Sequence, residues 1–158
     1  MNERGISKEA LFATLPPEWP EPLLPAIRAQ LAVRPTKVVV LDDDPTGTQT
    51  VHDIPVLTDW SEAALRAELQ QTGPGFYLLT NSRAFPVEEA CRINREIGER
   101  LSRVAAELRQ DFVVVSRGDS TLRGHFPDEV EALGAALTAG RTRPPILLCP
   151  QFEAGGRH

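Results

Sequence analysis

Short apolar runs alternate along this chain with longer amphipathic stretches. The runs at 38–41, 76–80, 112–115 and 146–149 are almost wholly apolar. Such runs are typical of strands in a parallel sheet that is covered on both faces. A shorter run at 54–58 predicts one further strand, which makes five.

The stretches between these runs carry apolar residues at helical spacing. They predict helices over 61–71, 86–110 and 127–139. The longest begins at Pro86, and its apolar residues form one stripe: Ala90, Ile93, Ile97, Leu101, Val104, Ala105 and Leu108. Two more helices, over 8–15 and 22–32, are expected before the first strand.

Strands that alternate with helices indicate an α/β fold with a mostly parallel sheet. We expect a three-layer domain with five strands in the order 2-1-3-4-5 over residues 37–158, and an N-terminal helical appendage over residues 1–36. The chain stops in a loop at 151–158, with no helix to close it. We therefore expect a further C-terminal domain that is absent from this sequence.

Composition narrows the class of protein. The 158 residues carry a net charge of −5, which gives no general attraction to phosphate backbones, so nucleic acid is not an expected partner. No apolar run approaches the ~18 residues that span a bilayer, and the N-terminus lacks the apolar core of a signal peptide. We expect a cytoplasmic protein without a membrane partner. Cys91 and Cys149 lack metal-ligand spacing, so a reduced, metal-free pair is expected.

Three consecutive aspartates follow the first strand, and the chain then turns at Pro45 and Gly47. Asp42, Asp43 and Asp44 thus lie at the carboxyl end of a strand, where open α/β sheets bind ligands. Adjacent carboxylates repel one another and need a cation, a hydroxyl-rich ligand or hydrogen-bond donors. The alternative is an ordinary solvated Asp-Pro turn.

Four strand-end loops, at 42–47, 81–83, 117–125 and 151–158, are expected to converge on one edge of the sheet. Their carboxylates can accept hydrogen bonds from hydroxyl groups, and their guanidinium groups suit a carboxylate or phosphate. Together they fit a small polyhydroxylated acid, although mutual ion pairing is an equal alternative for each residue. The charged residues concerned are Asp42, Asp43, Asp44, Asp119, Glu153, Arg83, Arg117, Arg123 and Arg157. The loops that contain Gly47 and Gly124 both lack the glycine and lysine spacing of a P-loop, so nucleotide binding by this chain alone is not expected.

Three blocks of this sequence, in order, resemble motifs of the four-carbon acid sugar kinase family: LDDDPTGTQTVHDIPVLT, TNSRA and SRGDSTLRGH. The resemblance covers residues 37–158, although many members have a shorter DDLTGA-like acidic motif. It implies a Rossmann-like domain that binds the sugar acid, and a C-terminal half, missing here, that binds ATP with magnesium.

The resemblance also implies which residues line the substrate cleft: Asp43, Asp44, Thr46, Gly47, Ser82, Arg83, Asp119, Ser120, Arg123 and Gly124. The strand-end argument adds Asp42 and Arg117. Asp44 is the candidate for the residue that faces the acceptor hydroxyl, with Asp43 or Asp119 as alternatives. Arg123 is expected to bind the carboxylate of the substrate.

Two other functions are open. The pattern Asp42-x-Asp44-x-Thr46 fits the opening motif of haloacid-dehalogenase-type phosphatases, with Asp42 as nucleophile and a bound magnesium ion. That chemistry also needs a later lysine, and none follows Lys37. The other function is a non-catalytic module that binds a sugar acid.

Overall fold

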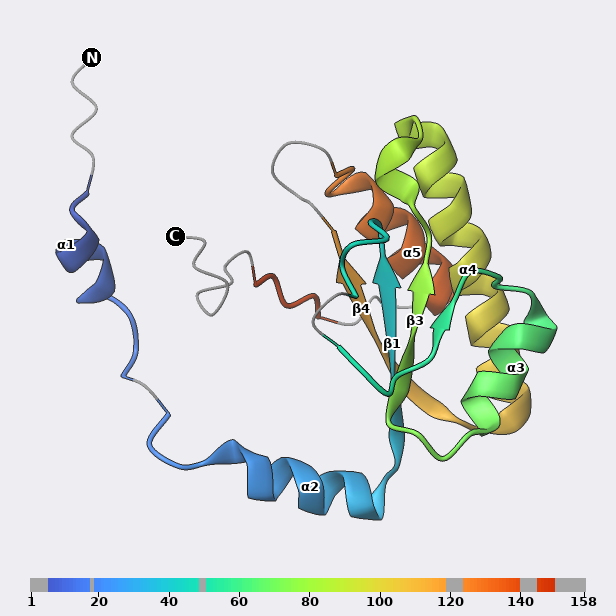
Figure 1. Ribbon diagram of the computed structural model, residues 1–158. Helices are drawn as coiled ribbons and strands as arrows, with labels where there is room; N and C mark the ends of the chain where they lie inside the picture. Colours follow the sequence, from blue (N-terminus) through green and yellow to red (C-terminus); the bar gives the residue numbers. More distant parts are fainter. Residues whose placement is uncertain (1–5, 18, 49–50, 119–123, 140–144, 150–158) are drawn as a thin grey trace. The chain divides into compact units, whose positions relative to one another are not determined.

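The computed structural model describes residues 6–17, 19–48, 51–118, 124–139 and 145–149 (Figure 1). The chain divides into two compact units, residues 1–35 and residues 36–158, and each is described by itself. Within the described ranges, no helix is both long enough and apolar enough to cross a membrane.

The first unit contains helices α1 (Lys8–Phe12) and α2 (Leu23–Val33). The hydroxyl oxygen of Ser7 caps α1 by accepting a hydrogen bond from the amide of Ala10, at 3.2 Å. Helix α1 ends three residues before the predicted end. No residue of either helix is buried, and the apolar stripe of α2 is exposed.

The second unit is built on a parallel four-stranded sheet. Its strands are β1 (Thr36–Asp42), β2 (Val56–Leu57), β3 (Gly75–Leu79) and β4 (Asp111–Arg117). They lie in the order β2-β3-β1-β4, and Figure 1 shows β1 in the centre between β3 and β4. Asp42, the acidic residue that ends β1, therefore has a strand end on either side.

Three helices, α3 (Glu62–Gln70), α4 (Val87–Leu108) and α5 (Asp128–Thr138), share one apolar core with the sheet. Val39 and Leu41 of β1 face this core, as do Phe76 and Leu78 of β3. The apolar stripe predicted for α4 is the buried face of that helix, and α4 packs against α5 (Figure 1). A short 3₁₀ helix, η1 (Ser82–Ala84), follows β3.

The structure corrects the predicted sheet in three respects. The sheet has four strands, because residues 145–149 form no strand and Leu147 is 91% exposed. The predicted order 2-1-3-4-5 is wrong, because β3 lies between β1 and β2. The described part of this unit has two layers instead of three: Val38 and its register partner Val113 are exposed on the face opposite the helices. An apolar run predicts a strand, but it does not specify a partner or a covering layer.

Candidate functional site

Three strands of the sheet end side by side. Asp42, the last residue of β1, is in register with Leu79 of β3 and with Arg117 of β4. Because the strands are parallel, the segments that follow them begin at one edge of the sheet. We call this edge the rim, which comprises residues 42–48, 80–85, 117–118 and 124–125.

The aspartates of the rim are buried and organise the turn that follows β1. Asp44 Oδ1 accepts a hydrogen bond from the amide of Thr46 at 3.0 Å, and Asp44 Oδ2 accepts one from the hydroxyl of Thr46 at 2.6 Å. The amide of Asp44 donates to Asp42 Oδ1 at 3.1 Å. Asp42, Asp43 and Asp44 are at most 5% exposed. The turn is therefore not the solvated Asp-Pro loop of the sequence-based alternative.

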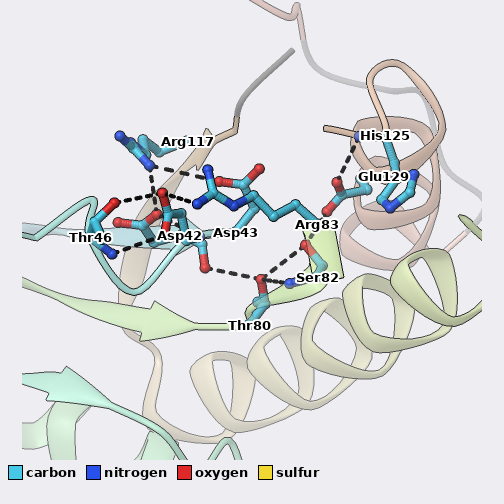
Figure 2. A network of polar contacts seen from close by, with 10 residues as sticks. Asp42, Asp43, Thr46, Thr80, Ser82, Arg83, Arg117, His125 and Glu129 are labelled. Carbon is cyan, nitrogen blue, oxygen red and sulfur yellow. Dashed lines mark hydrogen bonds and ion pairs between the residues drawn. The ribbon is translucent and has the colours of Figure 1, made fainter. Parts of the chain in front are cut away.

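Two arginines from the neighbouring strand ends lie against these aspartates. Arg117 Nη1 is 3.0 Å from Asp42 Oδ1 and 3.7 Å from Asp43 Oδ1 (Figure 2). Arg83 Nη2, from η1, is 2.5 Å from Asp44 Oδ2. The side chain of Arg117 is 44% exposed. The structure thus brings together five of the predicted charged residues and presents part of one guanidinium group to solvent.

Gly47 lies directly over Asp42. A Cβ atom at position 47 would come within 3.0 Å of both carboxylate oxygens of Asp42 and of Arg117 Nη1. Asp42 Oδ2 is buried and has no hydrogen-bond partner among the described residues. A buried acceptor without a donor destabilises the folded state, and such groups are more typical of functional sites than of ordinary turns.

The Thr46 hydroxyl and amide hold the pKa of Asp44 below its ordinary value, and the charges of Arg83 and Arg117 lower it further. Asp44 is therefore an anion at neutral pH. A carboxylate with a lowered pKa is a weak proton acceptor, but as an anion it still accepts charge-assisted hydrogen bonds. This suits it to orient a hydroxyl group more than to store a proton.

We expect the substitution Thr46→Ala to raise the pKa of Asp44. The folded-state pKa of Asp44 lies below the unfolded value, so its ionisation stabilises the fold above the unfolded pKa, and this stabilisation is lost as pH falls through the folded pKa. Thr46→Ala should move that loss to higher pH. An NMR titration of the Asp44 carboxyl carbon and urea unfolding at pH 5 and pH 3 measure both effects.

Asp59 offers a matched control, because the amide and hydroxyl of Ser61 bond its carboxylate in the same manner, at 2.9 and 2.8 Å. These bonds also lower the pKa of Asp59. In Thr46→Ala the titration of Asp59 should stay unchanged. An unchanged Asp44 titration would mean that Thr46 does not determine the pKa of Asp44.

A second polar network joins the rim to α5. Asn81 adopts a left-handed conformation with φ of 52°, which asparagine tolerates better than most residues, and it turns the chain after β3. Thr80 Oγ1 then lies 3.0 Å from the carbonyl oxygen of Asp42 and 3.1 Å from Ser82 Oγ. Ser82 Oγ donates to Glu129 Oε2 at 2.6 Å (Figure 2). The hydroxyl proton of Ser82 is thus used in a hydrogen bond to α5.

Thr80 and Glu129 were not among the residues predicted to line the sugar-acid site. In the sequence, Glu129 is one of three acidic residues near the start of α5. A signal does exist, because Glu129 shares its helix face with Ala132 and Leu133, which are buried. A carboxylate on an apolar helix face needs donors from elsewhere in the fold.

Several predicted site residues fall outside the described ranges. They are Asp119, Ser120, Arg123, Glu153 and Arg157. Gly124 is described and lies next to His125, whose amide donates to Glu129 Oε1 at 3.3 Å. The predicted role of Arg123 stays a prediction.

The described rim residues do not fit a magnesium ion. The carboxylates already pair with Arg83 and Arg117, whose positive charges disfavour a metal cation at the same place. Among the described residues, no three potential ligands are grouped so that they could hold a metal ion. The described rim residues therefore supply no set of ligands for magnesium.

Comparison with family models finds a match over most of the chain. The model of a family described as a sugar-binding N-terminal domain matches residues 38–158, which include all of the sheet except the first two residues of β1, and every described residue of the rim. No curated protein and no solved structure matches the chain. Since the match covers well over half of the 158 residues, the chain belongs to the family of sugar-binding N-terminal domains.

Proposed function

We propose that this chain is the substrate-binding part of an ATP-dependent kinase that phosphorylates a four-carbon acid sugar such as threonate or erythronate. One observation carries the proposal: Arg83 and Arg117, from two strand ends, are held against the aspartates that end a third strand. Membership in a sugar-binding family supports a sugar as the ligand. The two arginines support an acidic group on that sugar.

The rim offers two kinds of group to such a substrate. A guanidinium group binds a carboxylate through charged hydrogen bonds, and the partly exposed side chain of Arg117 is placed for this. The carboxylates of Asp43 and Asp44 accept hydrogen bonds from hydroxyl groups. A substrate with a carboxylate at one end and hydroxyl groups along its chain satisfies both.

Phosphoryl transfer asks little covalent chemistry of the protein, because positioning and charge stabilisation account for most of the catalysis. Asp44 is our candidate for the residue that orients the acceptor hydroxyl, with Asp43 beside it. The low pKa of Asp44 agrees with orientation as its main task. In this proposal ATP and magnesium bind to a further, C-terminal domain, which is the partner of this chain.

The phosphatase alternative is less favoured. Its nucleophile would be Asp42, whose carboxylate is fully buried beneath Gly47 and pairs with Arg117. A phosphate group would have no path to that carboxylate without movement of the turn. The non-catalytic module shares the binding site with the kinase proposal, so only a test of phosphoryl transfer separates the two.

We expect the wild-type chain to bind threonate or erythronate, and Arg83→Lys to weaken this binding about tenfold or more. Lysine keeps the charge but loses the planar pair of donors, and a charged hydrogen bond contributes about 1.5–3 kcal/mol. Isothermal titration calorimetry measures the affinity, with erythritol as a neutral ligand. Arg103→Lys is the matched control, because Arg103 pairs with Glu62 on the helical surface away from the rim.

Equal binding of erythritol and the acids, or no binding of either acid, would contradict the proposed substrate class. The kinase activity needs its own assay, in which ATP, magnesium and the bound acid are added to the longest natural chain that contains residues 1–158. Binding without phosphoryl transfer in that chain would favour the non-catalytic module.

A further inference from the structure

Glu129 is a buried carboxylate that joins three segments of the second unit. It is 8% exposed and lies in the first turn of α5. Glu129 Oε2 accepts hydrogen bonds from Ser82 Oγ at 2.6 Å and from Asn94 Nδ2 at 2.9 Å, and Oε1 accepts one from the amide of His125 at 3.3 Å. Figure 2 shows Glu129 between Ser82 and His125, apart from the acidic cluster.

All three donors are neutral groups, so this carboxylate is retained in the interior by hydrogen bonds and by the start of a helix. A negative charge is favourable at a helix N-terminus, which offsets part of the cost of burial. Asp128 and Glu131 occupy the same first turn but are exposed. Glu129 alone of the three points into the protein, toward the rim segments.

Two of the residues that donate hydrogen bonds to Glu129 lie next to candidate substrate contacts. Ser82 directly precedes Arg83, which pairs with Asp44. His125 directly follows Gly124, and its ring nitrogen Nε2 lies 2.9 Å from the carbonyl oxygen of Phe85. The rim segments 80–85 and 124–125 are therefore joined twice. Glu129 accepts hydrogen bonds from both, and the His125 ring contacts the carbonyl oxygen of Phe85 directly.

The network continues from Ser82 through Thr80 to the carbonyl oxygen of Asp42. Ser82 is fully buried, and its hydroxyl proton is donated to Glu129, so the side chain of Ser82 has no proton left for a ligand. Its contribution to the rim is to set the course of the backbone that presents Arg83.

We propose that Glu129 is a positioning residue for the sugar-acid site. It holds the Ser82–Arg83 turn and the His125 end of the neighbouring segment, so that the guanidinium group of Arg83 stays over Asp44 without contact between Glu129 and the ligand. This inference rests on the proposed function for the identity of the ligand. The position of Arg83 can be measured without any ligand.

The test combines binding with a spectroscopic signal. Glu129→Gln keeps the size of the side chain but turns one acceptor oxygen into a donor, and Ser82→Ala removes the link from the other side. We expect each substitution to weaken threonate or erythronate binding about tenfold. The double variant should bind about as weakly as either single variant, because both break the same link.

In the ligand-free protein, the Arg83 Nε–H resonance should shift or broaden in Glu129→Gln and in Ser82→Ala. Leu137→Ala is the control for lost stability: Leu137 lies in the last turn of α5, packs against the core and is remote from the rim. It should lower the melting temperature and leave both the Arg83 signal and the binding unchanged.

The proposal that Glu129 positions Arg83 is overturned if the Arg83 signal stays in place in both Glu129→Gln and Ser82→Ala. It is also overturned if Leu137→Ala shifts that signal equally. Additive losses of binding in the double variant would also overturn it, because they would mean that Ser82 acts on the ligand directly. If the wild type binds no acid sugar while the Arg83 signal still depends on Glu129, the proposed function fails and the positioning role stands. Should Glu129→Gln not fold, Ser82→Ala carries the same comparison.

Discussion

The substitution Gly47→Ala is expected to reduce binding of a sugar acid by a hundredfold or more and to destabilise the second unit. The added methyl group would come within 3.0 Å of both carboxylate oxygens of Asp42, and it would lie 2.6 Å from Arg117 Nη1. Asp42 cannot retreat easily, because its carboxylate is buried and bonded to the amide of Asp44 and to Arg117. Overpacking of this kind costs about 1–3 kcal/mol.

Calorimetric titration and urea unfolding measure the two effects of Gly47→Ala. Gly73→Ala is the general control, because a Cβ atom there meets no atom within 4 Å. Gly118→Ala is a control for stability at the rim itself, where the nearest atom, Asp43 Oδ2, is 3.6 Å away. If Gly47→Ala is as stable as these controls, the turn above Asp42 is looser than the structure indicates.

The substitution Arg117→Met is expected to lower the free energy of unfolding by about 1–3 kcal/mol and to weaken sugar-acid binding at least thirtyfold. Asp42 is fully buried and, among the described residues, would keep only the amide of Asp44 as a donor. Loss of one partner from a buried ion pair costs about 3–5 kcal/mol, and the partial exposure of Arg117 reduces this figure. Urea unfolding and calorimetric titration again provide the two values.

The double variant Asp42→Asn with Arg117→Met tests whether the unpaired charge of Asp42 causes the loss of stability in Arg117→Met. Asparagine removes the buried charge, so the double variant should be more stable than Arg117→Met alone, whereas binding should stay weak. A double variant that is as unstable as the sum of the two single losses would show that the charge of Asp42 is not what Arg117 neutralises.

The local elements of the second unit follow from the sequence because each depends on residues close together in the chain. The apolar stripe of α4 marks its buried face, and the apolar runs at 38–41, 76–80 and 112–115 correspond to β1, β3 and β4. Helix α3 begins after Ser61, whose hydroxyl oxygen caps it. Hydrophobic periodicity and capping are local signals, so a single sequence carries them in full.

The grouping of charged residues at the rim could also be predicted in part from the sequence. In a parallel sheet, the carboxyl ends of all strands lie at one edge, so residues that follow different strands must meet there. This argument predicted that Asp42, Asp44, Arg83 and Arg117 lie close together, and they do. It could not predict which oxygen pairs with which guanidinium nitrogen, since that depends on strand register.

Hydrophobic periodicity was enough to predict the four strands and the three helices of the second unit, and the charged residues at the rim. The folded structure was needed to show that β3 lies next to β1, that residues 146–149 add no strand, and that Ser82 donates its proton to Glu129. Strand pairing and the bonds of buried polar groups join residues that are distant in the chain: Ser82 and Glu129 are 47 positions apart. Their free energies arise from long-range packing, and no local pattern of apolar and polar residues records which distant partner each group will find.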